Sequence, residues 1–102
     1  MEEILNREKF AECLGTSFDV QHDGDMPLSL ELIEATQLPV RDEAQRSGLR
    51  QQPFSLVFRG PTGVTFSQNT YRLKHALLGS LDIFLVPIGP DDEGMCLEAV
   101  FN

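Results

Sequence analysis

Apolar and polar residues alternate along much of this chain, a pattern typical of strands with one face in a core and the other in water. The alternation is clear in three early segments, TSFDV (16–20), LSLELIEATQL (28–38) and PFSLVFR (53–59). An Asp23-Gly24 pair lies between the first two segments and suits a tight hairpin turn. The pattern therefore predicts an antiparallel sheet.

The second half of the chain continues the strand pattern. GPTG (60–63) predicts a turn, so VTFSQNTYRLK (64–74) is expected to form a hairpin with the strand before it. After a bend at HALLGS (75–80), the segment LDIFLVPIG (81–89) is apolar at both odd and even positions, which predicts a central strand buried on each face. A polar turn, PDDEG (90–94), leads to a last alternating strand, MCLEAVF.

Only LNREKFAECLG (5–15) has the period of a helix. Phe10, Cys13 and Leu14 share one face, while Asn6 can cap the start of the helix and Gly15 can end it. A helix over about 6–14 is predicted, docked through Phe10 and Leu14.

Residues 39–53 have no usable periodicity and predict a long mobile loop. Taken together, these elements predict one all-β (mainly β) domain over residues 1–102. Its expected architecture is a small antiparallel β-barrel or rolled sheet of about six strands with one short N-terminal helix.

Composition and charge narrow the classes of partner. The chain is 41% hydrophobic and 24% charged, and none of its apolar runs approaches the roughly 20 residues that cross a bilayer. Its first residues lack the pattern of a secretory signal, so a cytoplasmic location is expected. Sixteen acidic and eight basic residues give a net charge of −8, which repels polyphosphate and anionic lipid. We therefore expect no nucleic acid and no membrane as partner.

No segment has the spacing of a known catalytic or metal site. HDGD (22–25) fits a hairpin turn better than a calcium loop, and DDEG (91–94) fits a solvated turn. Cys13 and Cys96 lie in apolar patterns and are expected to be buried thiols. The sequence predicts no catalytic residue, no metal ligand and no cofactor.

Four residues are candidates for a ligand site, namely Arg59, Tyr71, Arg72 and His75. Arg59 ends an apolar strand and is interpreted first as structural, tied to turn carbonyls or to a carboxylate such as Glu98. His75 is interpreted first as fixing the bend after it by hydrogen bonds, with a general base as the alternative.

Three arginines in the predicted loop, Arg41, Arg46 and Arg50, are candidates for a positive patch that contacts a partner. The alternative is that they belong to a solvated loop.

Four runs of the sequence carry a resemblance to a known family, and they are LGTSF, PFSLVFRGP, QNTYRLKHALLGSLDIFLVPIG and EAVFN. They resemble a family of small bacterial proteins of unknown function and similar length. The resemblance implies that relatives lie beside genes for phage-tail-collar-like proteins, and hence a role in assembling or decorating a tail-like or surface particle. It implies no catalytic residues.

The leading functional hypothesis is a non-enzymatic interaction or assembly module with a protein partner. The loop over 39–53 and the strand edges are its expected contact surface, and self-association through an edge is a variant. The alternative is a small barrel that binds an acidic ligand, or a minor enzyme, with a site near Arg59, Tyr71 and His75.

Overall fold

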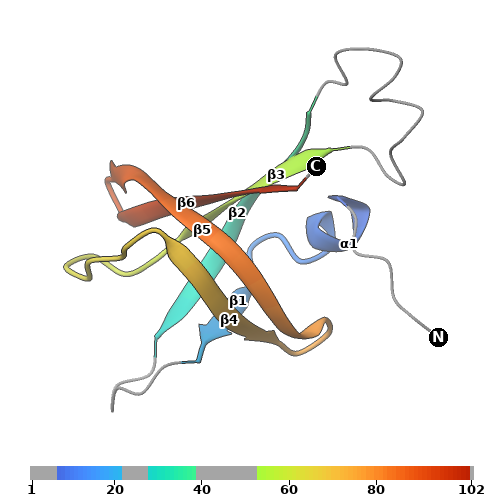
Figure 1. Cartoon of the computed structure of the whole chain (residues 1–102), viewed down its shortest axis with the longest axis horizontal. Coiled ribbons are helices and arrows are strands. Elements are labelled where there is room, and N and C mark those ends of the chain that lie inside the picture. The colour runs from blue at the N-terminus through green and yellow to red at the C-terminus, as the bar shows by residue number, and fades with distance from the viewer. Residues whose placement is uncertain (1–6, 22–27, 39–52, 102) are drawn as a thin grey trace.

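The computed structural model describes residues 7–21, 28–38 and 53–101 and contains one sheet that closes into a ring (Figure 1). Its elements are α1 (Arg7–Ala11), β1 (Ser17–Val20), β2 (Ser29–Gln37), β3 (Phe54–Arg59), β4 (Asn69–His75), β5 (Gly79–Asp91) and β6 (Gly94–Phe101). Around the ring the order is β1-β2-β3-β6-β5-β4, β4 returns to β1, and every neighbouring pair is antiparallel. This confirms the prediction of a rolled, mainly β fold with one short helix.

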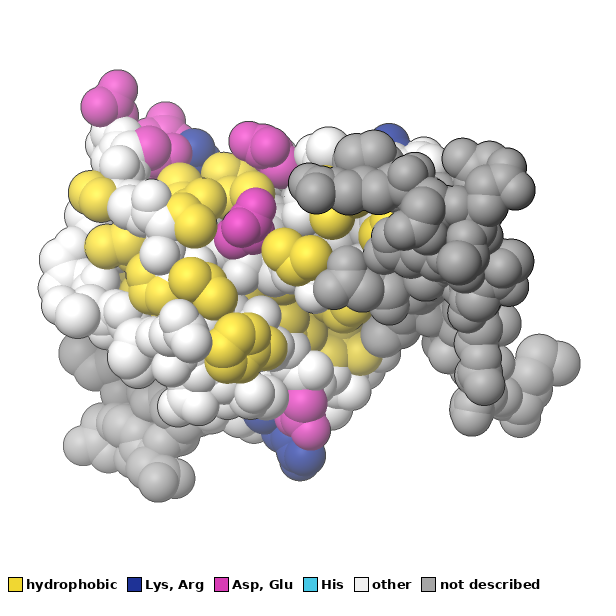
Figure 2. Space-filling view, turned by 45° about the horizontal axis from the view of Figure 1, so that its top comes forward, with side chains coloured by type: hydrophobic (Ala, Val, Ile, Leu, Met, Phe, Trp, Pro, Cys, Tyr) yellow, Lys and Arg dark blue, Asp and Glu magenta, His cyan; other side chains and the backbone are white. Residues whose placement is uncertain are grey.

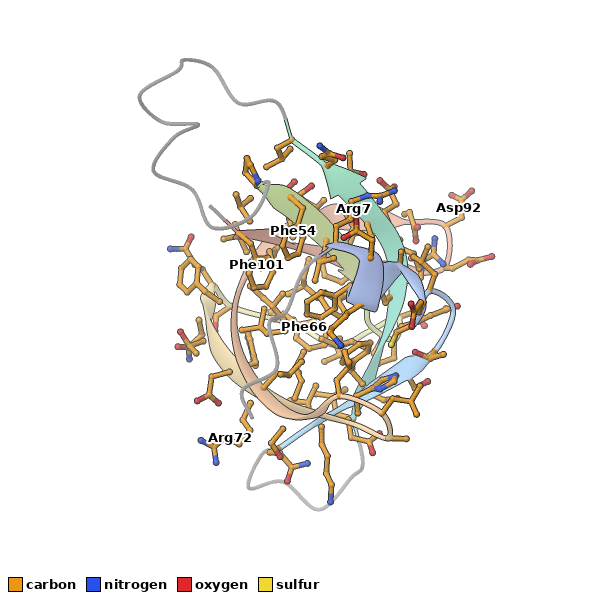
Figure 3. The ribbon with its side chains drawn as sticks, turned by 90° about the vertical axis from the view of Figure 1, so that its right-hand side faces the viewer. Arg7, Phe54, Phe66, Arg72, Asp92 and Phe101 are labelled. Atoms are coloured by element: carbon orange, nitrogen blue, oxygen red, sulfur yellow. The ribbon has the colours of Figure 1, made fainter. Side chains whose placement is uncertain are left out.

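The core fills the inside of the ring because every second residue of each strand points inward. Its largest fully buried side chains are Phe10, Phe18, Phe54, Phe58, Leu30, Leu32, Leu56, Leu73, Leu85 and Leu97. The Phe54 and Phe101 rings stack with centroids 4.6 Å apart, and Phe10 of α1 packs on both at 5.9 and 5.8 Å (Figure 3). The helix therefore covers one end of the ring.

The helix is shorter than predicted, and Leu14 does not dock. After α1 the chain tightens, because the amide of Cys13 bonds to the carbonyl of Phe10 and the amide of Leu14 bonds to that of Ala11, both three residues back. This tightening turns Leu14 off the stripe formed by Phe10 and Cys13, and it is 44% exposed. The predicted cap, Asn6, lies outside the described residues.

The predicted hairpin between PFSLVFR and VTFSQNTYRLK is wrong. β3 pairs with β2 and β6, whereas β4 pairs with β5 and β1, so the two segments are not neighbours in the sheet. Residues 60–68 contain no strand, and Phe66 from this connection is buried in the core. A Cβ added at Gly60 would lie 2.6 Å from the Phe66 ring, so glycine is required where the connection begins.

β5 is the longest strand and lies between β4 and β6, but it is not covered on both faces. Ile83 and Leu85 are buried, whereas Phe84 on the outer face is 51% exposed. The prediction of two buried faces is wrong, because no layer of the described structure covers the outside of the ring here. The predicted Asp23-Gly24 turn and residues 39–52 of the predicted loop lie outside the described residues.

Candidate functional site

Arg59 ends β3 on the outer side of the ring and is held by the turn between β5 and β6. Its Nε and Nη2 donate to Oδ2 of Asp91 at 2.9 and 2.5 Å, and its Nη1 lies 3.0 Å from Oε2 of Glu93. The sequence hypothesis offered Glu98 as a carboxylate partner, but the structure places Asp91 and Glu93 there instead. The guanidinium is therefore already engaged by two acids of its own chain.

Asp91 joins this ion pair to the geometry of the turn. Its Oδ1 accepts hydrogen bonds from the backbone amides of Glu93 and Gly94 at 2.8 and 3.0 Å. The hydrogen bond from Arg59, followed by the bond from the Glu93 amide, lowers the pKa of Asp91 from 3.8 to about 2. The Asp91 carboxylate consequently stays charged well below neutral pH.

A pocket of about 390 Å³ opens beside Arg59 on the outer surface. Its charged lining consists of Arg59, Glu31 and Glu93, and the rest is Ser17, Leu28, Ser29, Gly60 and Pro61. Two carboxylates and one paired guanidinium give this lining a net negative charge. An acidic ligand would therefore be repelled here.

Tyr71 and Arg72 are also engaged within the chain. The Tyr71 hydroxyl donates to the carbonyl of Ser67 at 2.6 Å. Arg72 extends away from the sheet and pairs with Asp82 on β5, with Nε 2.9 Å from Oδ1 (Figure 3). Both side chains of this pair are exposed, so the ion pair contributes little to stability.

His75 lies inside the ring, 5% exposed, and fixes two local structures. Its Nδ1 accepts hydrogen bonds from the amides of Leu77 and Leu78 at 3.0 and 3.3 Å, so the ring hydrogen is on Nε2. Nε2 lies 2.8 Å from Oγ1 of Thr16, which itself donates to the carbonyl of Cys13. His75 thereby ties the β4–β5 turn to the end of the helical segment, and both ring nitrogens are occupied.

The structure does not bring the four candidate ligand residues together. Arg59 is on β3, while the other three lie on β4, and two strands separate β3 from β4 in either direction around the ring. Arg59 and Arg72 are on the surface, whereas His75 is in the interior. Arg41, Arg46 and Arg50 lie outside the described residues.

A different surface is prominent on β3, β6 and β5, and sequence reasoning did not identify it as a site. We call it the apolar outer face and define it by Val57, Phe84, Val86, Glu98, Val100 and Ile88. Phe84, Ile88 and Val100 are each about half exposed, at 51%, 54% and 52%. Figure 2 shows hydrophobic side chains gathered over β5 and β6 with acidic side chains among them. The signal that could have revealed this surface is the two-sided apolar pattern of LDIFLVPIG.

Glu98 lies at the centre of this face. It is in register with Val57 on one side and with Val86 on the other. Directly opposed residues on one face of a sheet have Cβ atoms about 5 Å apart, so two valines flank its carboxylate. Within the described part of the chain, the Glu98 side chain has no ion pair and no hydrogen bond.

With the geometry known, comparison with known proteins identifies the family. The sequence matches the family described as a domain of unknown function, DUF6916, over residues 5–101. The chain belongs to this family. That result confirms the resemblance to a family of unknown function, and it leaves the role of DUF6916 domains to be argued from the structure.

The chain matches no curated protein and no solved structure. Among the residues that the structure describes, no group of three or more His, Cys, Asp or Glu side chains could hold a metal ion. None of the described residues forms a helix of the length and apolar character needed to span a membrane.

Proposed function

We propose that this DUF6916 domain is a non-enzymatic interaction module that docks a protein partner on its apolar outer face. The observation that carries the proposal is the exposure of Phe84, Ile88 and Val100 on adjacent strands. Single exposed apolar residues are ordinary on protein surfaces, but several gathered on one sheet face are characteristic of an interaction site. Covering them would bury both faces of β5, which is the state that its sequence pattern favours.

The resemblance carried by the second half of the chain extends this proposal to an assembly. It implies neighbouring genes whose products build phage-tail-like or surface particles. A small domain with one exposed apolar face is suited to be an accessory component of such a particle. Self-association through a strand edge is a variant of this proposal, because Ala99–Phe101 at the end of β6 pair with β3 but have no strand partner on the β5 side among the described residues.

The small-ligand alternative has less support. The inside of the ring is filled by aromatic and leucine side chains. The pocket of about 390 Å³ is lined by Arg59 but not by Tyr71, Arg72 or His75, and Arg59 already has two acidic partners.

The proposal is tested by affinity purification of the tagged chain from its native cells, followed by mass spectrometry. The variant is Phe84→Ser/Val100→Ser, and the matched control is Leu77→Ser. Leu77 is 77% exposed but lies in the β4–β5 turn, away from the apolar outer face. We expect the double variant to lose about tenfold or more of a specific partner that the control retains.

An identical set of captured proteins for the double variant, the control and the unaltered chain would contradict the proposal. A parallel deletion of residues 40–52 tests whether Arg41, Arg46 and Arg50 add to the contact. If the deletion alone loses the partner, the docking surface is that segment rather than the apolar outer face.

A further inference from the structure

We infer that the partner presents a basic amphipathic helix, and that one of its lysines or arginines pairs with Glu98. This inference rests on the proposed function, since it names the chemistry of the partner for the same face. It is carried by three observations on the outer surface of β2, β3, β6 and β5.

The first observation is the carboxylate of Glu98, which lies between Val57 and Val86 and has no ion-pair or hydrogen-bond partner among the described residues. A partner that covers the valines must also remove water from Glu98. Burying a carboxylate without a counter-charge is strongly unfavourable, whereas a hydrogen-bonded cation offsets much of that cost. A partner with a purely apolar contact surface is therefore disfavoured, and one that brings a cation into an apolar surround is favoured.

The second observation concerns the backbone. β6 pairs with β3 over Cys96–Phe101 on one side and with β5 over Gly94–Glu98 on the other, so Glu98 is paired on both sides, as is Val57 on β3. The row through Val57 and Glu98 therefore offers side chains rather than a free row of backbone donors and acceptors. An extended peptide added as a new strand would find no edge there. A helix satisfies its own backbone hydrogen bonds and can dock through side chains alone.

The third observation is a second carboxylate in the same row. Glu34 on β2 is in register with Val57, so the row across three strands reads Glu34, Val57, Glu98. Glu34 and Glu98 are two strand spacings apart, or about 10 Å. Residues i and i+7 of a helix are also separated by about 10 Å along its axis. A helix that crosses the strands with basic residues at i and i+7 would meet both carboxylates, with apolar residues between them over Val57.

The same charges argue against two other occupants. A second copy docked face to face would bring the Glu98 carboxylates of two chains together, each chain with a net charge of −8. An anionic lipid surface would meet the same repulsion.

The experiment titrates the full-length, ¹⁵N-labelled chain with two synthetic peptides of about 18 residues. Both carry the same leucine stripe of an amphipathic helix, and one has lysines and the other glutamates flanking it. The protein variants are Glu98→Lys and, as a matched control with the same change in net charge, Glu12→Lys. Glu12 is exposed beside α1, and it lies away from the apolar outer face.

We expect the lysine peptide to shift the amide resonances of Val57, Val86, Glu98 and Val100. Glu98→Lys should weaken its binding about tenfold or more, whereas Glu12→Lys should change it less than about twofold. The glutamate peptide should bind Glu98→Lys better than it binds the unaltered chain. Equal weakening by the two variants, or shifts that map away from this face, would overturn the inference.

The two proposals fail in different ways. If the glutamate peptide binds the face of the unaltered chain as tightly as the lysine peptide does, the face docks partners but the inferred charge is wrong. If the double variant Phe84→Ser/Val100→Ser loses no partner from cells, the proposed function fails whatever the result of the peptide titrations. A concentration-dependent dimer of the chain alone that Glu98→Lys abolishes would show that a second copy is the occupant, and would also overturn the inference.

Discussion

Replacing His75 by alanine tests whether this residue is structural, as its hydrogen bonds indicate, or is held for a ligand. The substitution removes three hydrogen bonds, two from the Leu77 and Leu78 amides and one with Thr16. Each is worth about 1 kcal/mol net. It also removes the packing of the imidazole on Phe18, whose ring centroid is 4.4 Å away, for about 1 kcal/mol more. We expect His75→Ala to lower the free energy of unfolding by about 4 kcal/mol.

His75→Asn separates the two roles of the ring. The Asn side-chain oxygen can occupy the place of Nδ1 and accept from the turn amides, but the side chain does not reach Thr16. We therefore expect this variant to lose about 1 to 2 kcal/mol, and Leu77→Ala, which changes an exposed side chain, to lose less than about 0.5 kcal/mol.

The assay is urea unfolding followed by far-ultraviolet circular dichroism, which suits a chain without tryptophan. A loss below about 1 kcal/mol for His75→Ala would refute the structural role. A loss as large for His75→Asn as for His75→Ala would show that the turn hydrogen bonds are not what His75 contributes.

Three further predictions concern the turn, the ion pair and the end of the ring. In Gly94→Ala the new Cβ would collide with the carbonyl oxygen of Gly60, so we expect a loss of about 1 to 3 kcal/mol in the same urea assay, and an unchanged midpoint would contradict this. In Arg59→Gln the pKa of Asp91, measured by NMR titration of its carboxyl carbon, should rise from about 2 toward 3.8. In the unaltered chain the stabilising pair is intact above pH 3.8 and is lost as the pH falls toward 2. An Asp91 titration midpoint that does not move in the variant would show that Arg59 is not the cause of the low pKa. Phe101→Ala, which removes one ring of the stacked aromatic cluster, should cost about 3 kcal/mol in urea unfolding, and a cost below about 1 kcal/mol would mean that α1 packs without it.

The exposed face of β5 also bears on how the chain behaves alone. Phe84 and Ile88 remain about half exposed although the strand pattern around them is that of a covered strand. A surface of this kind favours association when no partner is present. The net charge of −8 opposes that association, because copies of the chain repel one another.

The local pattern of the chain was sufficient to predict most of the strands, although residues 64–68 were predicted as strand and are not one. The core positions Phe18, Leu30, Phe58 and Leu97 all lie in alternating segments, because the inside of a closed sheet accepts one apolar residue in every two. The short helix and the bend at His75 were likewise predicted from local signals, namely a change of period and a glycine at position 79, whose φ is 77°. These features depend on residues that are close together in the sequence, so they can be predicted from the sequence alone.

The strand partners of β3 and the neighbours of the polar side chains depended on the tertiary structure. The turn at Gly60 does not reveal whether the chain returns beside β3 or crosses to the far side of the ring, since either path has the same local pattern. Likewise, the sequence contains several acidic residues that could pair with Arg59. The strand registers place Asp91 beside Arg59 and place Glu98 between two valines. The sequence by itself determined most of the strands and the inward-facing core. Only the tertiary structure decided which strands meet and which apolar face stays open, because both are set by contacts between segments far apart in the chain.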